Sequence, residues 1–219
     1  MLRRMAPETG LTEHADGRSR CSWCGDKDDY IAYHDDEWGR PSVDDRHLFE
    51  KICLEGFQSG LSWLTILRKR DNFRRAFAGF DFEKVARFNK RSVERLLGDA
   101  GIVRHRGKIE AAIHNARRCS DLVDEFGSLA AFVWSFEPGP AERPARATWQ
   151  SLRQITTSPA SEALSRELRR RDWKFVGPTT MYAFLQSEGV VNDHVEGCWA
   201  RQPVEDERSA LVRPKPAVG

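Results

Sequence analysis

Two pairs of potential metal ligands, one near each end of the chain, constrain the fold more than any other sequence feature. Cys21 and His34 enclose twelve residues, and His194 and Cys198 enclose three. Thiolate and imidazole ligands suit tetrahedral Zn²⁺, and a set of four protein ligands is typical of a structural rather than a catalytic zinc. If all four bind one ion, the fold must bring the two ends of the chain together. Cys24 forms a second pair with Cys21, so the spacing alone leaves open which cysteine binds.

The composition predicts one domain with no membrane segment. Of the 219 residues, 40% are hydrophobic, which is enough for a sizeable core. No apolar run approaches the length of a membrane span, and residues 1–20 lack the apolar segment of a secretory signal. Five cysteines in such a chain argue against a disulfide framework. We therefore expect a cytoplasmic protein, and a monomer.

Both ends of the chain differ in composition from the middle. Residues 1–19 are polar, and residues 202–219 are rich in proline and charge. Such segments bury little apolar surface, so we expect a flexible N-terminal extension and a flexible C-terminal tail. The folded domain would then span residues 20–201.

Apolar residues recur at helical spacing along most of that domain. Leu48, Phe49, Ile52 and Cys53 form one stripe, and the longest stripe runs from Ile109 to residue 126. No run of alternating strands is visible, and residues 137–146 form the clearest internal loop. The pattern predicts an all-α fold, with the helices in two lobes.

A glycine-containing turn near Gly101 separates two predicted helices. Gly101 can adopt backbone angles that other residues avoid, and free amides beside a helix N-terminus bind phosphate. Arg104, Arg106 and Lys108 follow, and positions 84–118 carry ten Lys or Arg against three acidic residues. We interpret residues 92–118 as a helix-hairpin-helix DNA-binding element. The alternative is an ordinary corner between helices, which has no need of the basic cluster.

Aromatic and acidic residues gather around the first ligand pair and the helix that follows. Trp23, Tyr33 and Trp38 flank the ligands without helical spacing, and together they could wall a slot for a flat ligand; the alternative is that they belong to the core. Glu55 closes an apolar stripe and is a candidate buried acceptor, unless it is an exposed helix-terminal residue. Leu61 lies on a turn before Trp63 and could act as a wedge between base steps.

Taken together, these segments resemble the 3-methyladenine DNA glycosylase I family. The resemblance is collinear over roughly residues 20–200 and is carried by many motifs. They are RCSW (20–23), YIAYHDDEWG (30–39), LFEKICLEG (48–56), QSGLSW (58–63), DAGIVRHRGKI (99–109), FVW (132–134), FVGPTT (175–180) and VNDHVEGC (191–198).

The resemblance implies a helix-hairpin-helix DNA glycosylase fold with a second helical, zinc-binding lobe built from the N- and C-terminal segments. It implies a structural Zn²⁺ bound by Cys21, His34, His194 and Cys198, with Cys24 as a bystander. It also implies a monofunctional enzyme that flips 3-methyladenine out of alkylated double-stranded DNA and excises it in base excision repair. The site residues that it implies are Glu55 as the catalytic carboxylate, Tyr33 as its hydrogen-bonding partner, Trp23 and Trp63 as stacking rings, Trp38 as part of the wall, and Leu61 as the intercalating residue.

Two other functions are compatible with parts of the sequence. One is a non-catalytic helix-hairpin-helix DNA-binding zinc protein. The joint presence of four pocket residues argues against it: Trp23, Tyr33, Glu55 and Trp63. The other is a zinc hydrolase or deaminase, because His34 and Glu37 resemble a ligand and base pair, but four ligands would close the site. After the hairpin no aspartate follows until Asp121, so we assign no water-activating residue. Lys108 is interpreted as a phosphate contact rather than a Schiff-base lysine.

Overall fold

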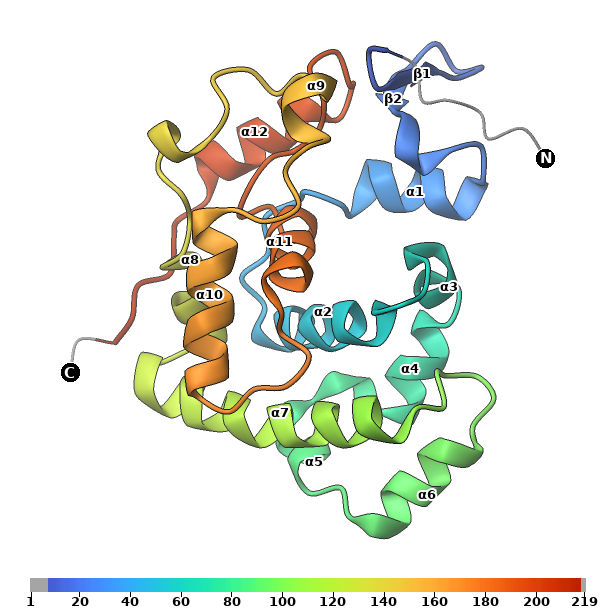
Figure 1. The fold of residues 1–219 in the computed structure, drawn as a ribbon, viewed down its shortest axis with the longest axis vertical. Coiled ribbons are helices and arrows are strands. Elements are labelled where there is room, and N and C mark those ends of the chain that lie inside the picture. Colours follow the sequence, from blue (N-terminus) through green and yellow to red (C-terminus); the bar gives the residue numbers. More distant parts are fainter. Residues whose placement is uncertain (1–7, 218–219) are drawn as a thin grey trace.

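The computed structural model describes residues 8–217, and helices dominate that range (Figure 1). A small antiparallel sheet of β1 (Leu11–Glu13) and β2 (Ser19–Cys21) comes first, with Leu11 paired to Cys21. The α-helices that follow are α1 (Asp28–Asp36), α2 (Asp45–Gln58), α3 (Trp63–Leu67), α4 (Arg70–Ala76), α5 (Phe82–Ala86), α6 (Lys90–Gly98), α7 (Arg106–Phe126), α8 (Leu129–Trp134), α9 (Trp149–Leu152), α10 (Pro159–Arg170), α11 (Pro178–Ser187) and α12 (Arg201–Ala210). Three short 3₁₀ turns, Ser22–Cys24, Ala78–Phe80 and Pro140–Glu142, complete the regular structure of these residues. The predicted all-α class is confirmed, apart from the small sheet.

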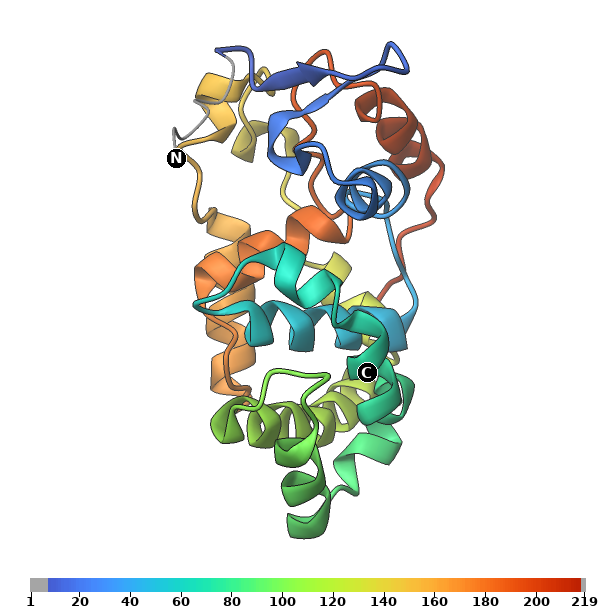
Figure 2. The same ribbon diagram turned by 90° about the vertical axis from the view of Figure 1, so that its right-hand side faces the viewer.

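The helices form two lobes on either side of α2 and α11, as the sequence predicted. Figures 1 and 2 show β1, β2, α1, α9 and α12 at one end of the molecule and α5, α6 and α7 at the other. Helix α11 packs on α2, and α7 packs on α5, α6 and α8. Among the described residues, no helix is both long enough and apolar enough to cross a membrane.

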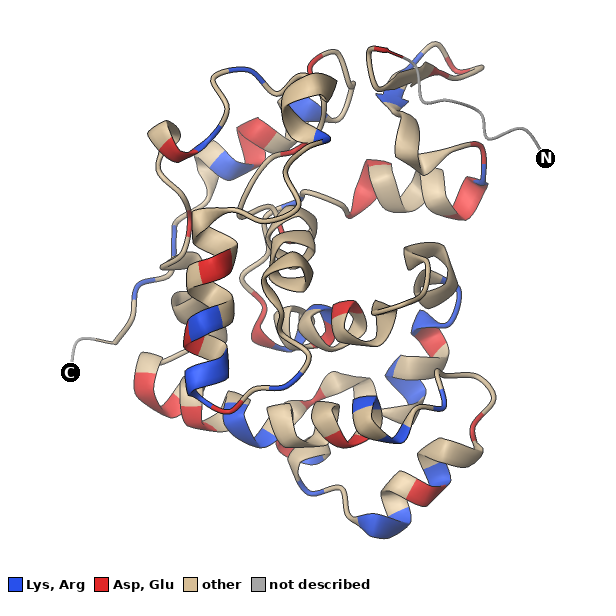
Figure 3. Cartoon of the chain, viewed as in Figure 1, with Lys and Arg blue, Asp and Glu red and all other residues tan. Residues whose placement is uncertain are grey.

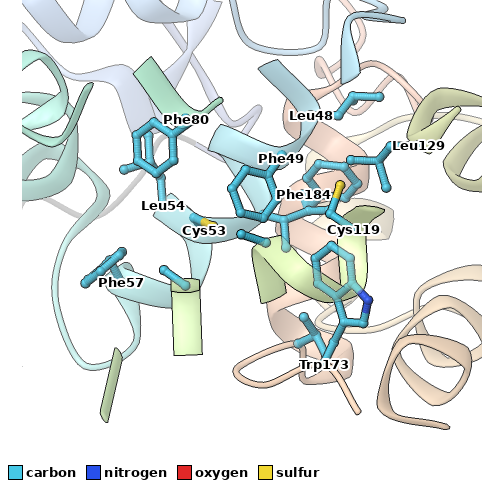
Figure 4. Close-up of a cluster of buried hydrophobic side chains, with 14 of the residues drawn as sticks. Leu48, Phe49, Cys53, Leu54, Phe57, Phe80, Cys119, Leu129, Trp173 and Phe184 are labelled. Carbon is cyan, nitrogen blue, oxygen red and sulfur yellow. The ribbon is translucent and has the colours of Figure 1, made fainter. Parts of the chain in front are cut away.

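Helix α2 is the centre of the core. Every residue from Leu48 to Phe57 is buried, so the helix is enclosed on all sides rather than along one stripe. Figure 4 shows Phe49 between Leu54 and Phe184, with Cys119 approaching from α7 and Trp173 from the segment after α10. Three of the buried α2 residues carry charge: Glu50, Lys51 and Glu55. A buried charge needs a partner, so these three residues are candidates for a role beyond core packing.

The two chain ends are more ordered than the sequence predicted. In the expected flexible extension, residues 11–21 form a hairpin whose Leu11 packs so closely on Gly197 that a Cβ there would lie 2.8 Å from Leu11 Cδ1. In the expected flexible tail, α12 buries Val204, while Arg208 pairs with Glu137. Composition suggested flexibility because few apolar residues are present, but Leu11 and Val204 pack against other parts of the fold, while Val212 is 88% exposed. Residues 1–7 and 218–219 of the expected flexible ends lie outside the described residues.

Candidate active site and metal centre

A cavity of about 270 Å³ lies beside α2 and is lined by aromatic rings. Its walls come from the turn after β2, from α1, α2 and α3, and from α9, α11 and the segment after α11. The lining residues are Trp23, Tyr30, Tyr33, Trp38, Glu55, Gln58, Trp63, Trp149, Leu152, Arg153, Ala183, Gln186, Asp193 and Val195. An apolar, ring-lined cavity with a few polar groups is the usual form of a site for a flat ligand.

The structure brings all five of the predicted pocket residues to this one cavity. Tyr33 and Trp63 are buried and their ring centroids lie 5.4 Å apart. The centroids of Trp23 and Trp38 lie 5.0 Å apart, at an interplanar angle of 66°. Glu55 is 5% exposed and lines the same cavity, so it is a buried carboxylate and not an exposed helix-terminal residue. Their positions agree with the expected base pocket, and their roles stay predictions.

Glu55 has one charged partner, which the sequence analysis missed. Lys51 lies one helical turn earlier, and its Nζ donates to Glu55 Oε1 (3.3 Å) and to Tyr33 Oη (3.1 Å). The same ammonium lies 3.7 Å from the centroid of the Trp63 ring. Burial raises the pKa of Glu55, and the charge of Lys51 opposes that rise. The spacing of a lysine four residues before a glutamate on an apolar helix was the available signal.

Other lining residues were not predicted as pocket residues, although Asp193 lies within the 191–198 motif. Asp193 Oδ2 accepts hydrogen bonds from Tyr182 Oη (2.6 Å) and Gln186 Nε2 (2.8 Å), and its other oxygen pairs with Arg143. With both carboxylate oxygens engaged, Asp193 holds the wall of the cavity in place. Trp149 belongs to α9, which follows the loop-like stretch 137–146 and gave no strong helical signal.

Four buried side chains from the two chain ends meet beside the cavity, as the ligand spacing predicted. One ligand atom from each of Cys21, His34, His194 and Cys198 lies within 4.8 Å of the others. Cys198 Sγ lies 3.4 Å from His34 Nε2 and 3.5 Å from His194 Nδ1, and Cys21 Sγ lies 3.7 Å from His194 Nδ1. Bonds of about 2.0–2.3 Å to a tetrahedral zinc imply ligand separations of about 3.3–3.8 Å, so the cluster could bind a metal ion of that kind.

Cys24 is not part of this group, which answers the question that the spacing left open. It is buried, but its thiol points to the carbonyl of Gly25 at 3.9 Å. The turn that carries Trp23 directs Cys21 and Cys24 to different surroundings.

Both histidines have a second hydrogen-bond partner that suits metal binding. His34 Nδ1 lies 2.8 Å from Asp35 Oδ1, and His194 Nε2 lies 3.0 Å from the carbonyl oxygen of Trp38. Each partner accepts a hydrogen bond from the N–H of the outer nitrogen, so that the lone pair of the other ring nitrogen faces the cluster. Arg20 in turn binds Asp35 through Nε and Nη2 at 2.8–3.0 Å.

The two thiols of the group shift each other's pKa. The hydrogen bond between them lowers the pKa of Cys198, and the same contact with burial raises the pKa of Cys21 well above its usual range. Two thiolates this close repel each other unless a cation lies between them.

The predicted hairpin lies between α6 and α7, and here the structure corrects two expectations. Gly101 does not need a positive φ; it is required because a Cβ would lie 2.9 Å from Asn72 Cγ, and its amide is already bound to Asp99 Oδ1 (2.7 Å). Lys108 is buried, and its Nζ donates to the carbonyls of Phe57 (2.9 Å) and Ser59 (2.6 Å). It was expected to be a phosphate contact, but these bonds instead tie the hairpin to the loop after α2.

That loop presents Leu61, and the other hairpin cations lie on the surface. Leu61 is 43% exposed, as a wedge residue must be. Arg104 is exposed, and Arg106 is exposed but pairs with Glu94 (2.8 Å) and Glu110 (3.5 Å). Figure 3 accordingly shows basic and acidic residues mixed over α6 and the start of α7.

The cavity, the ligand cluster and the arrangement of helices can now be compared with known proteins. A model of the family described as methyladenine glycosylase matches residues 23–202. This chain belongs to the methyladenine glycosylase family.

The similarity extends over nearly the whole length of individual family members. The chain is 51% identical over 180 residues to DNA-3-methyladenine glycosylase 1 of Escherichia coli K12, covering 82% of this chain and 95% of that protein. It is 42% identical over 181 residues to DNA-3-methyladenine glycosylase of Haemophilus influenzae, covering 82% and 96%. The solved structure of 3-methyladenine DNA glycosylase I from Staphylococcus aureus, which concerns recognition of 3-methyladenine, superimposes with a TM-score of 0.77 at 33% identity, covering 83% and 96%.

Membership of the family confirms the resemblance seen in the sequence and the helical fold that it implied. All of the lining residues fall within the matched range, from Trp23 to Val195. Cys21 and the β1–β2 hairpin precede the matched range.

Proposed function

We propose that this chain is a monofunctional DNA N-glycosylase that flips 3-methyladenine out of alkylated double-stranded DNA and releases it in base excision repair. The observation that carries the proposal is the meeting of Tyr33, Glu55 and Trp63 at one aromatic cavity in a methyladenine glycosylase family member. The relatives named above are 3-methyladenine glycosylases, which supports the same substrate for this chain.

The chemistry of the lesion suits a pocket with these groups. Alkylation at N3 gives the nucleotide a positive charge and makes the base a good leaving group, so little general-acid help is needed. Stacking of a cationic base on a tryptophan gains about 0.5–2 kcal/mol over the neutral base. The Glu55 carboxylate can accept a hydrogen bond from the exocyclic amine, and Tyr33 can contact the same base. Charge and shape together would select the damaged base.

We assign the flipping of the base to Leu61 and the binding of the DNA backbone to the hairpin surface. Extruding a nucleotide costs a few kcal/mol, and less for a poorly paired lesion. An exposed leucine on the loop after α2 can fill the space that the base leaves. Arg104 is the hairpin cation best placed to contact phosphate, and Arg106 could exchange its glutamates for phosphate. Lys108 supports this surface from within by fixing the loop that carries Leu61.

We also propose that Cys21, His34, His194 and Cys198 bind one structural Zn²⁺. The donor types, their separations and the second hydrogen-bond partners of both histidines fit that ion. The ion would supply no step at the glycosidic bond; it would join the two chain ends. Since His34 directly follows Tyr33 and Cys21 lies two residues before Trp23, it would also order one wall of the pocket.

Release of base from methylated duplex DNA tests the proposal directly. Purified protein is incubated with the DNA, and the released bases are identified by chromatography and mass spectrometry. We expect 3-methyladenine, and a strong decrease for Glu55→Gln with little change in affinity for undamaged duplex. Binding of DNA without release of any base would instead support the non-catalytic DNA-binding alternative. We also propose that the protein acts in the bacterial cytoplasm and that it is a monomer. Gel filtration tests the monomeric state.

A further inference from the structure

Lys51 is a buried charge that the proposed reaction has not yet used. It lies in the middle of α2 and is 2% exposed. Moving an ammonium out of water costs free energy, so contacts with its partners must offset this desolvation. Those partners are Glu55, Tyr33 and the ring of Trp63, which are three of the residues that define the cavity.

The neighbouring charges on α2 and around it are paired elsewhere. Glu50 binds Arg74 at 2.9 Å, and Glu188 lies 3.0 Å from His47. Glu37, directly after α1, is paired with Arg70. Glu188 acts on Glu55 from a longer range and adds to the rise of its pKa. Lys51 is therefore the group that offsets the charge of Glu55 in the empty site.

The contacts of Lys51 also fix directions within the site. An ammonium can only donate, so Tyr33 Oη accepts from Lys51, and the O–H of Tyr33 remains available to donate to another group. Lys51 lies over one face of the Trp63 ring, and that ring lines the cavity. Glu55 Oε1 is held by Lys51, and the second oxygen is free to accept.

We propose that Lys51 is a positioning residue: it holds Glu55 as an oriented carboxylate and sets the hydrogen-bonding direction of Tyr33 before the base arrives. This inference rests on the proposed glycosylase function. The charges of Lys51 and Glu55 then offset each other, while Asp193 of the same cavity is paired with Arg143 and Arg153 also lines it. The cationic nucleotide then meets a carboxylate that is already ionised, and no proton has to leave the site on binding.

Without Lys51, the rate of excision would depend on the protonation of Glu55. A buried carboxyl without a cation beside it has a raised pKa, because desolvation disfavours its charged form. In Lys51→Met we expect Glu55 to be protonated over a higher range of pH than in the parent protein. Excision should then fall by about tenfold for each pH unit below that range, because only the ionised form accepts from the amine.

The experiment compares the pH profiles of single-turnover excision of 3-methyladenine from methylated duplex. For Lys51→Met we expect a midpoint at higher pH than for the parent protein, and for the double variant Lys51→Met with Glu55→Gln we expect no such step. Arg74→Met is the matched control, because it removes the cation from another buried glutamate of α2, Glu50, outside the cavity. Its profile should match that of the parent protein.

Each outcome decides between the proposals. A Lys51→Met profile that coincides with the parent profile would overturn the role of Lys51 and leave the glycosylase function intact. Absence of release by the parent protein would overturn the function itself. If Lys51→Met does not fold, as judged by circular dichroism, Lys51→Gln serves in its place, because glutamine keeps donors for Glu55 and Tyr33 but lacks the charge. Its midpoint should move in the same direction, and an unmoved midpoint would again refute the proposal.

Discussion

Replacing Lys108 by methionine separates a support role from a phosphate contact. Lys108 Nζ donates to the carbonyls of Phe57 and Ser59, and the side chain is buried. Methionine keeps most of the aliphatic length but removes both donors. The loop that presents Leu61 would then lose its link to the start of α7.

The magnitude follows from the two hydrogen bonds. A hydrogen bond that involves a charged group contributes about 1.5–3 kcal/mol, so the two carbonyls together set an upper value of about 6 kcal/mol. Burial of the ammonium takes back part of this, and the same burial lowers the pKa of Lys108. We therefore expect Lys108→Met to reduce the free energy of unfolding by about 2–3 kcal/mol.

Two assays read the effect. Denaturant unfolding gives the loss of stability, and DNA affinity as a function of salt concentration gives the number of phosphate contacts. Each phosphate contact contributes about 0.9 to the slope of log affinity against log salt. For Lys108→Met the slope should not change, although excision falls because Leu61 is less well placed.

Arg104→Ala is the matched control on the same hairpin. This residue is exposed, so its loss should change stability by less than about 0.5 kcal/mol. The salt slope should fall by about one contact. If Lys108→Met behaves like Arg104→Ala, with a lower slope and unchanged stability, the support role is refuted.

Two further changes test the metal cluster and the wedge. Chelation or Cys198→Ser should remove bound zinc, which elemental mass spectrometry measures, and should lower the melting temperature because the buried thiols lose their cation. Cys24→Ser should change neither the zinc content nor the melting temperature. An unchanged melting temperature after removal of the metal would contradict a structural ion. Leu61→Ala should change the free energy of unfolding by less than about 0.5 kcal/mol, because the side chain is 43% exposed. It should slow excision from duplex DNA. Binding of free 3-methyladenine, followed by tryptophan fluorescence, should not change. An equal loss in both measurements would mean that Leu61 only packs.

The sequence by itself determined the helical class, the two-ended ligand set and five of the residues that line the aromatic cavity. Helical periodicity is a local property, so the stripes on α2 and α7 can be recognised without knowing what covers them. Ligand and pocket residues such as His34, Glu55 and Trp63 can be recognised because their chemistry and their motifs are written in consecutive positions. Composition does not show that Leu11 packs on Gly197 or that Val204 is buried, so these contacts of the two chain ends could not be predicted from it.

Only the tertiary structure decided which partner each polar group has. Cys21 rather than Cys24 faces the histidines because a single turn sends the two thiols in different directions. Lys108 turns inward to the carbonyls of Phe57 and Ser59, about fifty positions away in the sequence, and Lys51 turns toward Glu55 and Tyr33. Hydrogen bonds and ion pairs depend on distances of a few tenths of an ångström, and such distances between remote segments are set by packing and not by spacing along the chain.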